Sequence, residues 1–559
     1  MTYRFMLSAL STTVVLALSA QHAAADPTPL RDDIQVRHVV DLGRNMFRIA
    51  KDPRDKTLYV QANNGTISRV VMKSPEESSL TPVASSADHG FTNVQGFDIG
   101  PDGTFYIGAI TREGGRVNNI ARGVLDASGQ RTWTTIAVTE PIPSGTKNHP
   151  HPGIVLSPDG RFVYLNSGSR TDHGEVAAAS GYPPGTREVP LSSAILRVPS
   201  DGEGIVIPAD EEALKASGYF FADGFRNAFD MAFAPNGDLF AADNGPDSDL
   251  PDALMWVREG HHFGFPWRMG GIDNPQRFPD YDPAVDNYVL FTSSGARNDG
   301  LFHNDPDYPP PPMVFSDPVI NLGPDTDRLR DPETGDVVDV SDAGLTVKTF
   351  TPHSSPLGIV FDVDRAMSSE FNGDGFLLRT GGDCCNLINS FNDPDEDLLH
   401  LDLEKVGDNY QARVTRLVEG FRGPMDAEII GNRIFVIERS GPRALWEVTL
   451  PAGPPTVVAE SADGAVPRDS ALDPNYPNPF NPGTTIPYRL SADGPVELTV
   501  YDLAGQKIRT LFSGRLAAGA YTARWHGRDQ SGATVASGVY LYRLETAAFQ
   551  EARRLTLLK

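Results

Sequence analysis

The sequence is poor in cysteine: its 559 residues include only two, Cys384 and Cys385, which are adjacent. A scaffold held by several disulfides is therefore excluded, because such scaffolds need many cysteines in a short chain. Two adjacent cysteines can close a strained vicinal disulfide in an oxidising compartment, or they can remain as small buried thiols. The sequence leaves both states open.

Basic residues are also few. The chain has 48 Lys and Arg against 73 Asp and Glu, for a net charge of −25 and a pI of about 4.8. Such an acidic chain argues against a nucleic-acid partner and against an anionic membrane surface. Turn-forming residues, by contrast, are abundant. The 53 Gly and 46 Pro predict an all-β protein with many turns.

Long apolar runs are missing after the N-terminus. The one such run extends from Phe5 to Ala20, behind Arg4, and is followed by Ala23-Ala24-Ala25. This pattern predicts a secretory signal peptide at residues 1–25, cut after Ala25. A transmembrane anchor is the weaker interpretation because the run is short and contains Ser and Thr. We therefore expect a soluble, exported protein.

Six hairpin signals recur along the chain. Each is a turn followed by an apolar strand, and the turns begin at Asp52, Pro101, Pro158, Pro235, Asn372 and Gly431. Recurrence at roughly 40 to 60 residues is typical of propeller blades, which have four strands each. One blade cannot bury both of its faces, whereas a closed ring of blades can. The signals predict a six-bladed β-propeller over residues 26–450.

The spacing of these signals is interrupted between the fourth and the fifth. Residues 269–347 are rich in Asp, Pro and Asn, and they include a run of four prolines at 309–312. Long loops in compact domains are usually lids, binding walls or disordered segments. We expect this stretch to be an insertion on one face of the propeller.

The composition changes again from about Pro451. Residues 451–472 are rich in Pro, Ala, Ser and Glu and predict a linker. Behind it, residues 473–559 contain six short alternating segments that predict the strands of an immunoglobulin-like β-sandwich. These segments are residues 484–490, 496–501, 507–512, 519–525, 538–545 and 551–558.

The stretch from Gly224 to Trp267 carries the densest chemical signals. An alternating strand around Asp230 is followed by a Pro-Asn-Gly turn and a second apolar strand, and an acidic loop begins at Asp243. Closely spaced carboxylates and backbone carbonyls are what Ca²⁺ prefers, so the loop predicts a calcium site. A merely solvated acidic loop is the alternative. The candidate ligands are the carbonyls of Gly245 and Pro246 and the carboxylates of Asp247, Asp249 and Asp252.

This stretch resembles a known family. Arg226-Asn227, Gly245-Pro246 and Phe263-Gly264-Phe265-Pro266 stand where they do in soluble glucose/sorbosone dehydrogenase-like proteins. These proteins are six-bladed propellers, and their best-known members use pyrroloquinoline quinone (PQQ). The resemblance implies a quinoprotein-type oxidation of an aldose or polyol on one propeller face, with PQQ and Ca²⁺ as cofactors.

The resemblance also implies roles for single residues. His149 matches the position of the catalytic base, and Arg226 would stabilise the reduced quinone, with Asn227 beside it. Arg379 and Arg422 stand at or near the places of further cofactor-binding cations. Two alternatives remain open: His149 as an ordinary loop histidine, and Arg226 as a tie between blade edges through carbonyl hydrogen bonds.

Three positions depart from the family pattern. Phe229 and Phe91 each occupy the place of a glutamine, and Met425 stands where a second arginine is usual. Because PQQ carries three carboxylates, fewer cations should weaken its binding. The departures favour an alternative function, a non-catalytic propeller that binds carbohydrate or another surface ligand. A calcium-dependent lactone hydrolase is a third class, for which the sequence offers no nucleophile.

The C-terminal module resembles the sorting domain of type IX secretion substrates, which is related to immunoglobulin-like domains of flagellar hook-cap proteins. The segments that carry the resemblance are YPNPFNPGTTIPYRL, VYDLAGQKIRTL, SGVYLYRL and the basic end RRLTLLK. Residues 473–559 hold ten basic and seven acidic residues, a net charge of +3, which leaves −28 for residues 1–472. The resemblance implies export through the periplasm to the cell surface or medium, with the type IX machinery as partner.

Overall fold

A computed structural model describes most of the chain between residues 26 and 558. The described part excludes residues 1–25, 74–76, 146–148, 177–185, 247, 284–299, 332–333, 382–390, 442, 453–457, 460–468, 481–483, 517, 526, 528, 530–534 and 559. The predicted signal peptide, Asp247, the cysteine pair Cys384-Cys385 and most of the predicted linker lie outside the described residues.

Most strands belong to six sheets that are mainly antiparallel. In spatial order the first three are β3 (Met46–Lys51), β4 (Leu58–Ala62), β5 (Ile67–Val71) and β6 (Ser79–Ala84); β7 (Val94–Ile99), β8 (Phe105–Thr111), β9 (Val117–Leu125), β10 (Arg131–Thr139) and β14 (Ile205–Ile207); and β11 (Ile154–Leu156), β12 (Phe162–Ser167), β13 (Ala194–Pro199) and β15 (Phe220–Asp223).

The other three sheets complete the set. They are β16 (Ala228–Phe233), β17 (Leu239–Asp243) and β18 (Ala253–Val257); β24 (Pro356–Phe361), β25 (Gly375–Arg379), β26 (Asp397–Val406), β27 (Asn409–Glu419) and β1 (Thr28–Pro29); and β28 (Pro424–Ile430), β29 (Arg433–Glu438), β30 (Ala444–Thr449) and β2 (Gln35–Asp41). Two short helices, α1 (Ser86–His89) and α2 (Glu211–Ser217), lie in the connections.

The six sheets are arranged as the blades of a ring. The first strand of each blade contacts the first strand of the next, in the order β3, β7, β11, β16, β24, β28 and back to β3. The N-terminal strand β2 pairs with β30 and so forms the outer strand of the last blade. This pairing joins the start of the propeller to its end through backbone hydrogen bonds.

Each predicted hairpin turn joins the first and second strands of one blade. Between β16 and β17, for example, Gly237 has a φ of 86°, a left-handed conformation that glycine adopts without steric cost. Its N–H donates to the carbonyl of Ala234 and closes the turn. Buried side chains such as Phe240 then face the neighbouring blade. The predicted all-β propeller is confirmed.

Five of the six first strands are irregular at the same place near their start. The pairing register shifts between Met46 and Arg48 in β3 and at corresponding positions in β7, β16, β24 and β28. Such bulges re-aim a side chain, and they are frequent next to active sites. Phe47, Phe229, Leu357 and Met425 at these bulges pack into one apolar cluster, although they come from different blades of the ring. The cluster therefore fills the axis of the propeller.

In every second blade, an aspartate of the first strand joins that blade to the next one. The carboxylates of Asp98, Asp230 and Asp426 each accept a hydrogen bond from a backbone N–H in the first strand of the next blade, those of Leu156, Ile359 and Ile49. A buried carboxylate that accepts such bonds connects two sheets that share no ladder. The blades are thus joined by polar contacts as well as by apolar packing.

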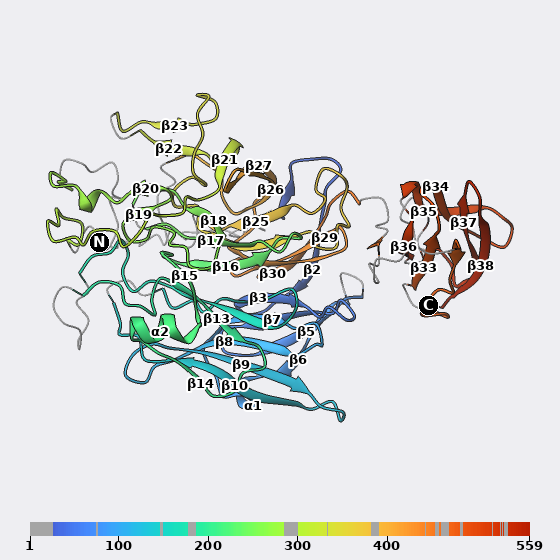
Figure 1. The fold of residues 1–559 in the computed structure, drawn as a ribbon, viewed down its shortest axis with the longest axis horizontal. Coiled ribbons are helices and arrows are strands. Elements are labelled where there is room, and N and C mark those ends of the chain that lie inside the picture. The colour runs from blue at the N-terminus through green and yellow to red at the C-terminus, as the bar shows by residue number, and fades with distance from the viewer. Residues whose placement is uncertain are drawn as a thin grey trace, which may run out of the picture.

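The predicted insertion at 269–347 begins within β19, which is the next strand after β18. Its described parts include the strand pairs β19 (Arg268–Met269) with β20 (Ile272–Asp273) and β22 (Arg328–Arg330) with β23 (Val337–Asp339), and the 3₁₀ turn η1 (Pro275–Arg277). A further strand, β21 (Ile320–Pro324), pairs in parallel with β27 and extends that blade. The two strand pairs lie on the side of the propeller away from the C-terminal module (Figure 1).

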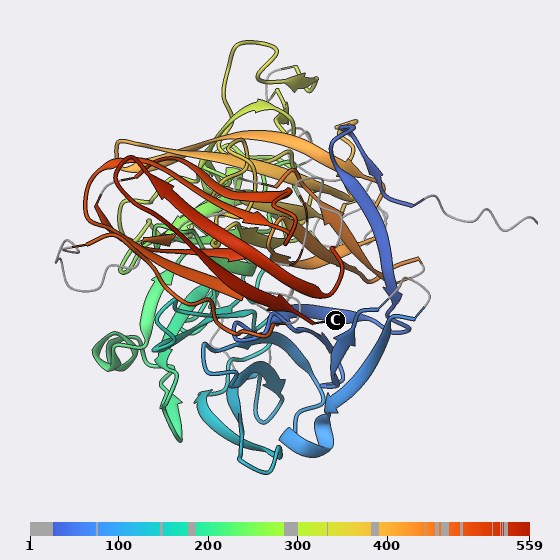
Figure 2. The same cartoon turned by 90° about the vertical axis from the view of Figure 1, so that its right-hand side faces the viewer.

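The C-terminal module is a sandwich of two sheets (Figure 2). One sheet has the order β31 (Val458–Ala459), β36 (Gly519–Trp525), β33 (Thr484–Leu490) and β32 (Ala471–Leu472); the other has β35 (Lys507–Leu516), β34 (Gly494–Tyr501), β37 (Gly538–Thr546) and β38 (Gln550–Leu557). All six predicted strands are present within a few residues of their predicted bounds. Their buried core, which includes Tyr488, Leu498 and Trp525, draws only on residues from Leu472 onward.

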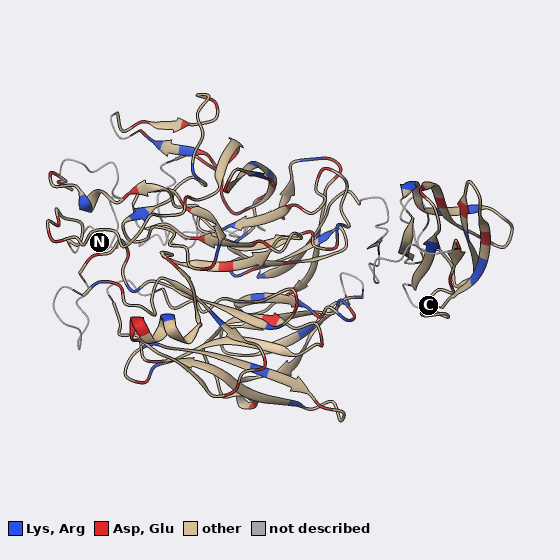
Figure 3. Cartoon of the chain, viewed as in Figure 1, with Lys and Arg blue, Asp and Glu red and all other residues tan. Residues whose placement is uncertain are grey.

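Charged residues of both signs are interspersed over the propeller and the sandwich in the view of Figure 3. In this view the acidic excess is therefore not gathered into one block. Within the described part of the chain, no helix has the length and apolar character needed to cross a bilayer.

Candidate active site on one propeller face

One end of the ring collects the residues that the sequence predicts for function. In every blade the first strand starts at this end and the antiparallel second strand finishes there, so that Ala228 pairs with Asp243. The segments before β11 and β16 meet through the backbone: His149 N–H donates to the carbonyl of Ser169, and Ser169 N–H donates to that of Arg226. The structure thus brings His149 and Arg226 to one face.

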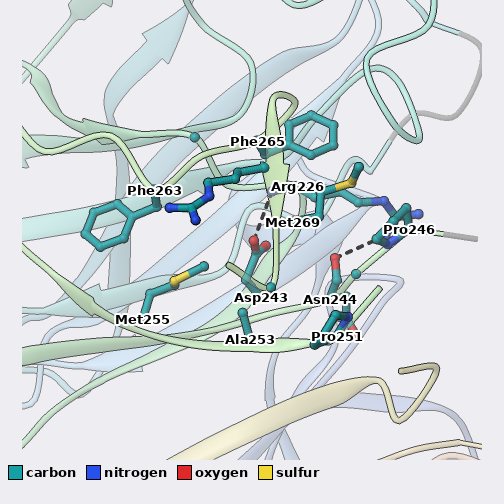
Figure 4. Close-up of a pocket in the computed structure, with 14 residues that line it drawn as sticks. Arg226, Asp243, Asn244, Pro246, Pro251, Ala253, Met255, Phe263, Phe265 and Met269 are labelled. Atoms are coloured by element: carbon teal, nitrogen blue, oxygen red, sulfur yellow. Dashed lines mark hydrogen bonds between the residues drawn. The ribbon is translucent and has the colours of Figure 1, made fainter. Parts of the chain in front are cut away.

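Arg226 is buried, and its guanidinium is engaged by the protein. Nε donates to the carbonyl of Asp172 at 3.0 Å, and Nη2 donates to the Asp172 carboxylate. Nη1 donates to the carbonyl of Asn244 at 3.2 Å, and both residues are drawn in Figure 4. Burial opposes ionisation of Asp172, but Arg226 and His173 together more than compensate and hold the pKa of that carboxyl below its usual range. Arg226 is therefore a fixed positive group whose donors are largely used within the protein.

Asp243 positions the Arg226-Asn227 pair at the end of β17. Its carboxylate accepts the backbone N–H groups of Arg226 and Asn227, at 3.2 and 2.6 Å. Burial raises the pKa of Asp243 to about 7. The side-chain Oδ1 of Asn227 is buried and has no hydrogen-bond partner among the described residues. This amide is available to a bound polar group.

A small cavity lies between Arg226 and the predicted calcium loop. Gly245, Pro246 and Asn244 line it on one side and Met269, from the start of the predicted insertion, on the other (Figure 4). Its volume is about 10 Å³, close to what a single water requires. Both polar side-chain atoms of Asn244 are buried without partners among the described residues. The cavity as it stands has room for one water-sized group.

The predicted calcium loop is held by protein contacts. Asp249 forms an ion pair with Arg330 at 2.7 Å, and Asp247 lies outside the described residues. The Asp252 carboxylate accepts three backbone N–H groups, those of Gly245, Ser354 and Ser355. In the part of the chain that the structure describes, no three His, Cys, Asp or Glu side chains are grouped so that they could hold a metal ion. The predicted calcium site therefore has no support from the described residues.

Arg379 ends β25 at the same face, but its side chain points into the protein. It is 0% exposed, and its nitrogens donate to the carboxylates of Asp397 and Asp393, which Arg416 shares. Burial lowers the pKa of Arg379, and the two aspartates more than reverse this effect. The network joins β25 to β26 and β27. Arg379 is in a structural ion pair, and its predicted contact with a cofactor finds no support in this geometry.

The last blade brings two arginines to the face. Arg422 precedes β28 and Arg439 follows β29, and the Arg439 backbone N–H donates to the carbonyl of Gly423 at 3.0 Å. The Nε atoms of both arginines are buried without partners, and no carboxylate among the described residues forms an ion pair with either. The sequence suggested one arginine here because Met425 occupies the second expected place. The hairpin supplies a second arginine, Arg439, from the neighbouring strand.

Two histidines stand at the entry to β11. The Nε2 atom of His149 is buried without a partner among the described residues, and burial together with Arg226 holds the pKa of this ring well below its usual value. His151 is partly exposed, and its Nδ1 is hydrogen-bonded to Oε1 of Gln95. Burial, followed by neighbouring arginines, lowers the pKa of His151 to about 4. Both rings are therefore uncharged at pH 7.

An arginine crosses the axis of the ring beside these histidines. Arg48 of β3 donates from Nε to the carbonyl of Gln95 at 2.9 Å and pairs with Asp230 of β16 at 3.1 Å. Its Cζ lies 4.5 Å from the ring centroid of Phe229. Because β3 and β16 are opposite strands of the ring, Arg48 closes the axis. Phe229 and Met425, two of the three departures from the family pattern, are buried in the apolar cluster there.

Four contributors to this face were not identified from the sequence: Asp172, Asp243, Arg439 and His151. Each acts through a partner distant in sequence, such as Asp172 with Arg226. Arg439 had one detectable signal, because it follows the last residue of β29, and second strands finish at the face. No comparable local signal marks Asp172.

The comparisons with known proteins concern separate parts of the chain. A family model described as the FlgD Ig-like domain matches residues 482–548. No curated protein sequence matches the chain. The solved structures similar to it include a soluble aldose sugar dehydrogenase from Escherichia coli in the apo-form, with 14% identity, coverage of 74% of this chain and 99% of that chain, and a TM-score of 0.46.

Two further solved structures are similar to most of the chain. The PQQ-bound aldose sugar dehydrogenase from Streptomyces coelicolor has 17% identity, covers 76% of this chain and 99% of its own, and has a TM-score of 0.44. A gluconolactonase from Xanthomonas campestris has 12% identity, covers 77% and 98%, and has a TM-score of 0.33. These likenesses concern the propeller fold and assign no activity to this chain.

Proposed function

We propose that the face carrying Arg226 and the two histidines binds an aldose or polyol and oxidises one of its hydroxyl groups, as in the quinoprotein-type dehydrogenases that the sequence resembles. The observation that supports this function is the pair of uncharged imidazoles beside fixed arginine cations. A neutral imidazole can accept the proton of a hydroxyl group. Fixed cations stabilise the negative charge that develops on the substrate oxygen as its proton is removed.

The described residues do not make a complete PQQ site. Arg422 and Arg439 are suited to carboxylates, since no described acid pairs with them. Other features argue against a PQQ site. The side-chain nitrogens of Arg379 donate to its neighbouring aspartates, and most of those of Arg226 donate to Asp172. The cavity beside Arg226, of about 10 Å³, is far too small for an organic cofactor. We therefore assign no step to PQQ, and the identity of the hydride acceptor is part of the test.

The test is a dye-reduction assay on the purified protein. Aldoses and polyols are offered with PQQ and Ca²⁺, with PQQ alone, and with neither, and PQQ binding is titrated separately. We expect dye reduction with aldoses or polyols. Dependence of that reduction on added PQQ, together with weaker PQQ binding when Arg422 and Arg439 are replaced by Ala, identifies a quinone as the hydride acceptor. Lys405→Ala, which removes a cation from the distal part of β26, is the matched control. Absence of both dye reduction and quinone binding would contradict the proposal.

A non-catalytic carbohydrate-binding propeller is the second candidate. It is favoured by the closed Arg226–Asp172 pair and by the apolar side chains of Phe229 and Met425 at the axis. Calorimetric titration with mono- and oligosaccharides separates the two functions. Sugar binding to a protein that neither binds quinone nor reduces dye would assign the chain to this class.

We also propose that residues 473–559 address the protein to the cell surface or medium through the type IX secretion machinery. The motifs of this module, its separate core and its net charge of +3 support the proposal. Deletion of the module should trap the protein in the periplasm of its native host, as measured by fractionation and immunoblotting. Normal delivery of the truncated chain would contradict it.

A further inference from the structure

We propose that His151, rather than His149, accepts the hydroxyl proton of the substrate on this face. The proposal rests on the proposed function and deepens it, because it names the proton acceptor and the atom involved. The acceptor is Nε2 of His151, and a chain of three amide side chains determines that this atom carries the lone pair.

The amide chain links the first three blades. Asn63, which follows β4, donates from Nδ2 to Oδ1 of Asn93 at 3.1 Å, and Gln95 donates from Nε2 to the same oxygen at 3.0 Å. The amino group of Gln95 is thus turned toward Asn93, and its carbonyl oxygen is turned toward His151. An amide oxygen only accepts hydrogen bonds, so Nδ1 of His151 must carry the hydrogen.

The charge state of the ring completes the assignment. A neutral imidazole has one N–H group, so a hydrogen on Nδ1 leaves the lone pair on Nε2. Burial and the cations of Arg48, Arg116, Arg439 and Arg226 lower the pKa of His151 to about 4, which keeps the ring neutral near pH 7. The second nitrogen is therefore available as an acceptor under ordinary conditions.

Packing holds the His151 backbone in place on two sides. A Cβ on Gly96 or on Gly108 would lie 2.3 Å from the carbonyl oxygen of Pro152, and a Cβ on Gly153 would lie 2.6 Å from the carbonyl oxygen of Phe229. The segment is thus pressed between the second and fourth blades. The His151 ring lies against the Phe229 ring, with centroids 5.4 Å apart. The ring orientation is therefore determined by packing as well as by its hydrogen bond.

The two histidines differ at Nε2. Both side chains are partly exposed, but the Nε2 atom of His149 is buried without a partner among the described residues, whereas Nε2 of His151 is not among the buried atoms that lack a partner. A general base must come within hydrogen-bond reach of the proton that it takes. The buried Nε2 of His149 does not meet this requirement, and the Nε2 of His151, which the amide chain leaves with the lone pair, is the candidate acceptor.

The proposed step is balanced as follows. The O–H bond of the substrate breaks and its proton bonds to Nε2 of His151. The hydrogen on the same carbon leaves with its electron pair as hydride to a soluble two-electron acceptor supplied with the substrate, and a C=O bond forms. The surrounding arginines disfavour a lasting imidazolium, so the proton passes to water before the next turnover.

The first test uses the protein without any cofactor. Diethyl pyrocarbonate acylates accessible, neutral imidazoles, and mass-spectrometric fragmentation distinguishes His149 from His151 within one peptide. We expect His151 to be modified, and to be protected by a bound sugar substrate, while His149 is not modified. Preferential modification of His149 would overturn the assignment.

The second test is kinetic. In the reconstituted dye assay, His151→Gln should lower kcat by roughly 10²-fold or more, and His149→Gln by much less. Gln95→Leu should lower kcat about 10-fold with little change in KM, because the tautomer is no longer held. His261→Gln, whose ring hydrogen-bonds to Ser316 away from these residues, controls for general effects. A larger loss in His149→Gln would overturn the proposal.

The proposed function and the role of His151 are contradicted by different results. An active wild-type protein whose His151→Gln variant is equally active leaves the proposed function standing and removes His151 from it. A wild-type protein that reduces no dye overturns the proposed function and, with it, the role of His151 as proton acceptor, even if the labelling pattern is the expected one.

Discussion

At the scale of single residues, the candidate site depends on buried charge. Arg226 and Asp172 form an ion pair in which the carboxylate is 0% exposed. Transfer of two charges out of water costs free energy that their attraction and hydrogen bonds must offset. Removal of one partner then leaves the other charged and buried. Such a pair holds the site in one geometry, because any displacement exposes an uncompensated charge.

We predict that Asp172→Ala lowers the free energy of unfolding of the propeller by about 3–5 kcal/mol, because Arg226 is left buried without its carboxylate. Urea unfolding followed by intrinsic fluorescence measures the change. Glu211→Ala, which breaks the exposed Lys215–Glu211 pair, is the matched control and should leave the midpoint unchanged. Equal midpoints for Asp172→Ala and the control would contradict the structural role of the pair.

A second residue-scale prediction concerns pH. Burial raises the pKa of Asp98 to about 7, whereas an unfolded aspartate titrates near 3.9. The native state therefore holds a proton that the unfolded state has lost, and stability decreases as pH rises through this window. Relative to Asp98→Asn, the wild type should lose up to about 1.4 kcal/mol of unfolding free energy per pH unit between roughly pH 4 and pH 7, and none above.

Urea unfolding of the two proteins at intervals between pH 4.5 and pH 8.5 measures this difference. Asp126→Asn is the control, since Asp126 lies in an exposed turn. A difference between wild type and Asp98→Asn that is constant with pH would show that the Asp98 carboxyl is ionised throughout.

At the scale of elements, the site depends on the bulged starts of the first strands. A register shift in β7 accompanies the close approach of the segment before β11, whose Pro152 carbonyl lies where a side chain at Gly96 would be. Two neighbouring blades can approach this closely only where one of them lacks a Cβ. The position of His151 is therefore set jointly by two strands.

We predict that Gly96→Ala lowers the free energy of unfolding by about 1–3 kcal/mol, because the added Cβ would lie 2.3 Å from the Pro152 oxygen and the backbone must shift. Diethyl pyrocarbonate labelling of His151 should change in the same variant. Gly494→Ala, where a Cβ meets nothing within 4 Å, is the matched control and should leave stability nearly unchanged. Unaltered stability and labelling in Gly96→Ala would argue that the segment is not pressed against β7.

At the scale of the whole molecule, two hydrophobic cores are separate. The core of the sandwich draws on residues from Leu472 onward, and the large clusters of the propeller end at Leu450. A module with its own core and a Pro- and Ala-rich connection folds independently by default. The propeller is in turn completed by β2, so its stability depends on the N-terminal strand and not on the C-terminal module.

We predict that a chain ending at Leu450 has the same propeller melting transition as the full chain, and that residues 469–559 fold alone. Calorimetry of the full chain should show two transitions, of which truncation removes only one. Deletion of β2, at residues 35–41, is the informative contrast and should abolish the propeller transition. Loss of that transition in the chain ending at Leu450 would show that the modules depend on each other.

Much of the fold was predictable because its signals are local. The turn at Pro235-Asn236-Gly237 and the alternation along residues 484–490 depend on neighbours in sequence, and both are found where expected. The placement of His149 and Arg226 on one face was predictable too, since each precedes the first strand of a blade. The signs of the charges around them were not predictable, because the partners Asp172 and Arg439 come from loop segments distant in sequence.

The sequence by itself determined the repeated hairpins, the all-β class and the separate sandwich, since turn chemistry and strand periodicity act over a few residues. Only the tertiary structure decided what each candidate side chain does. Arg379 forms ion pairs with Asp393 and Asp397. Arg226 forms an ion pair with Asp172, and the His151 ring is oriented by its hydrogen bond to Gln95. The reason is physical: the charge and tautomer of a buried group are set by partners that ring closure brings together from distant parts of the chain.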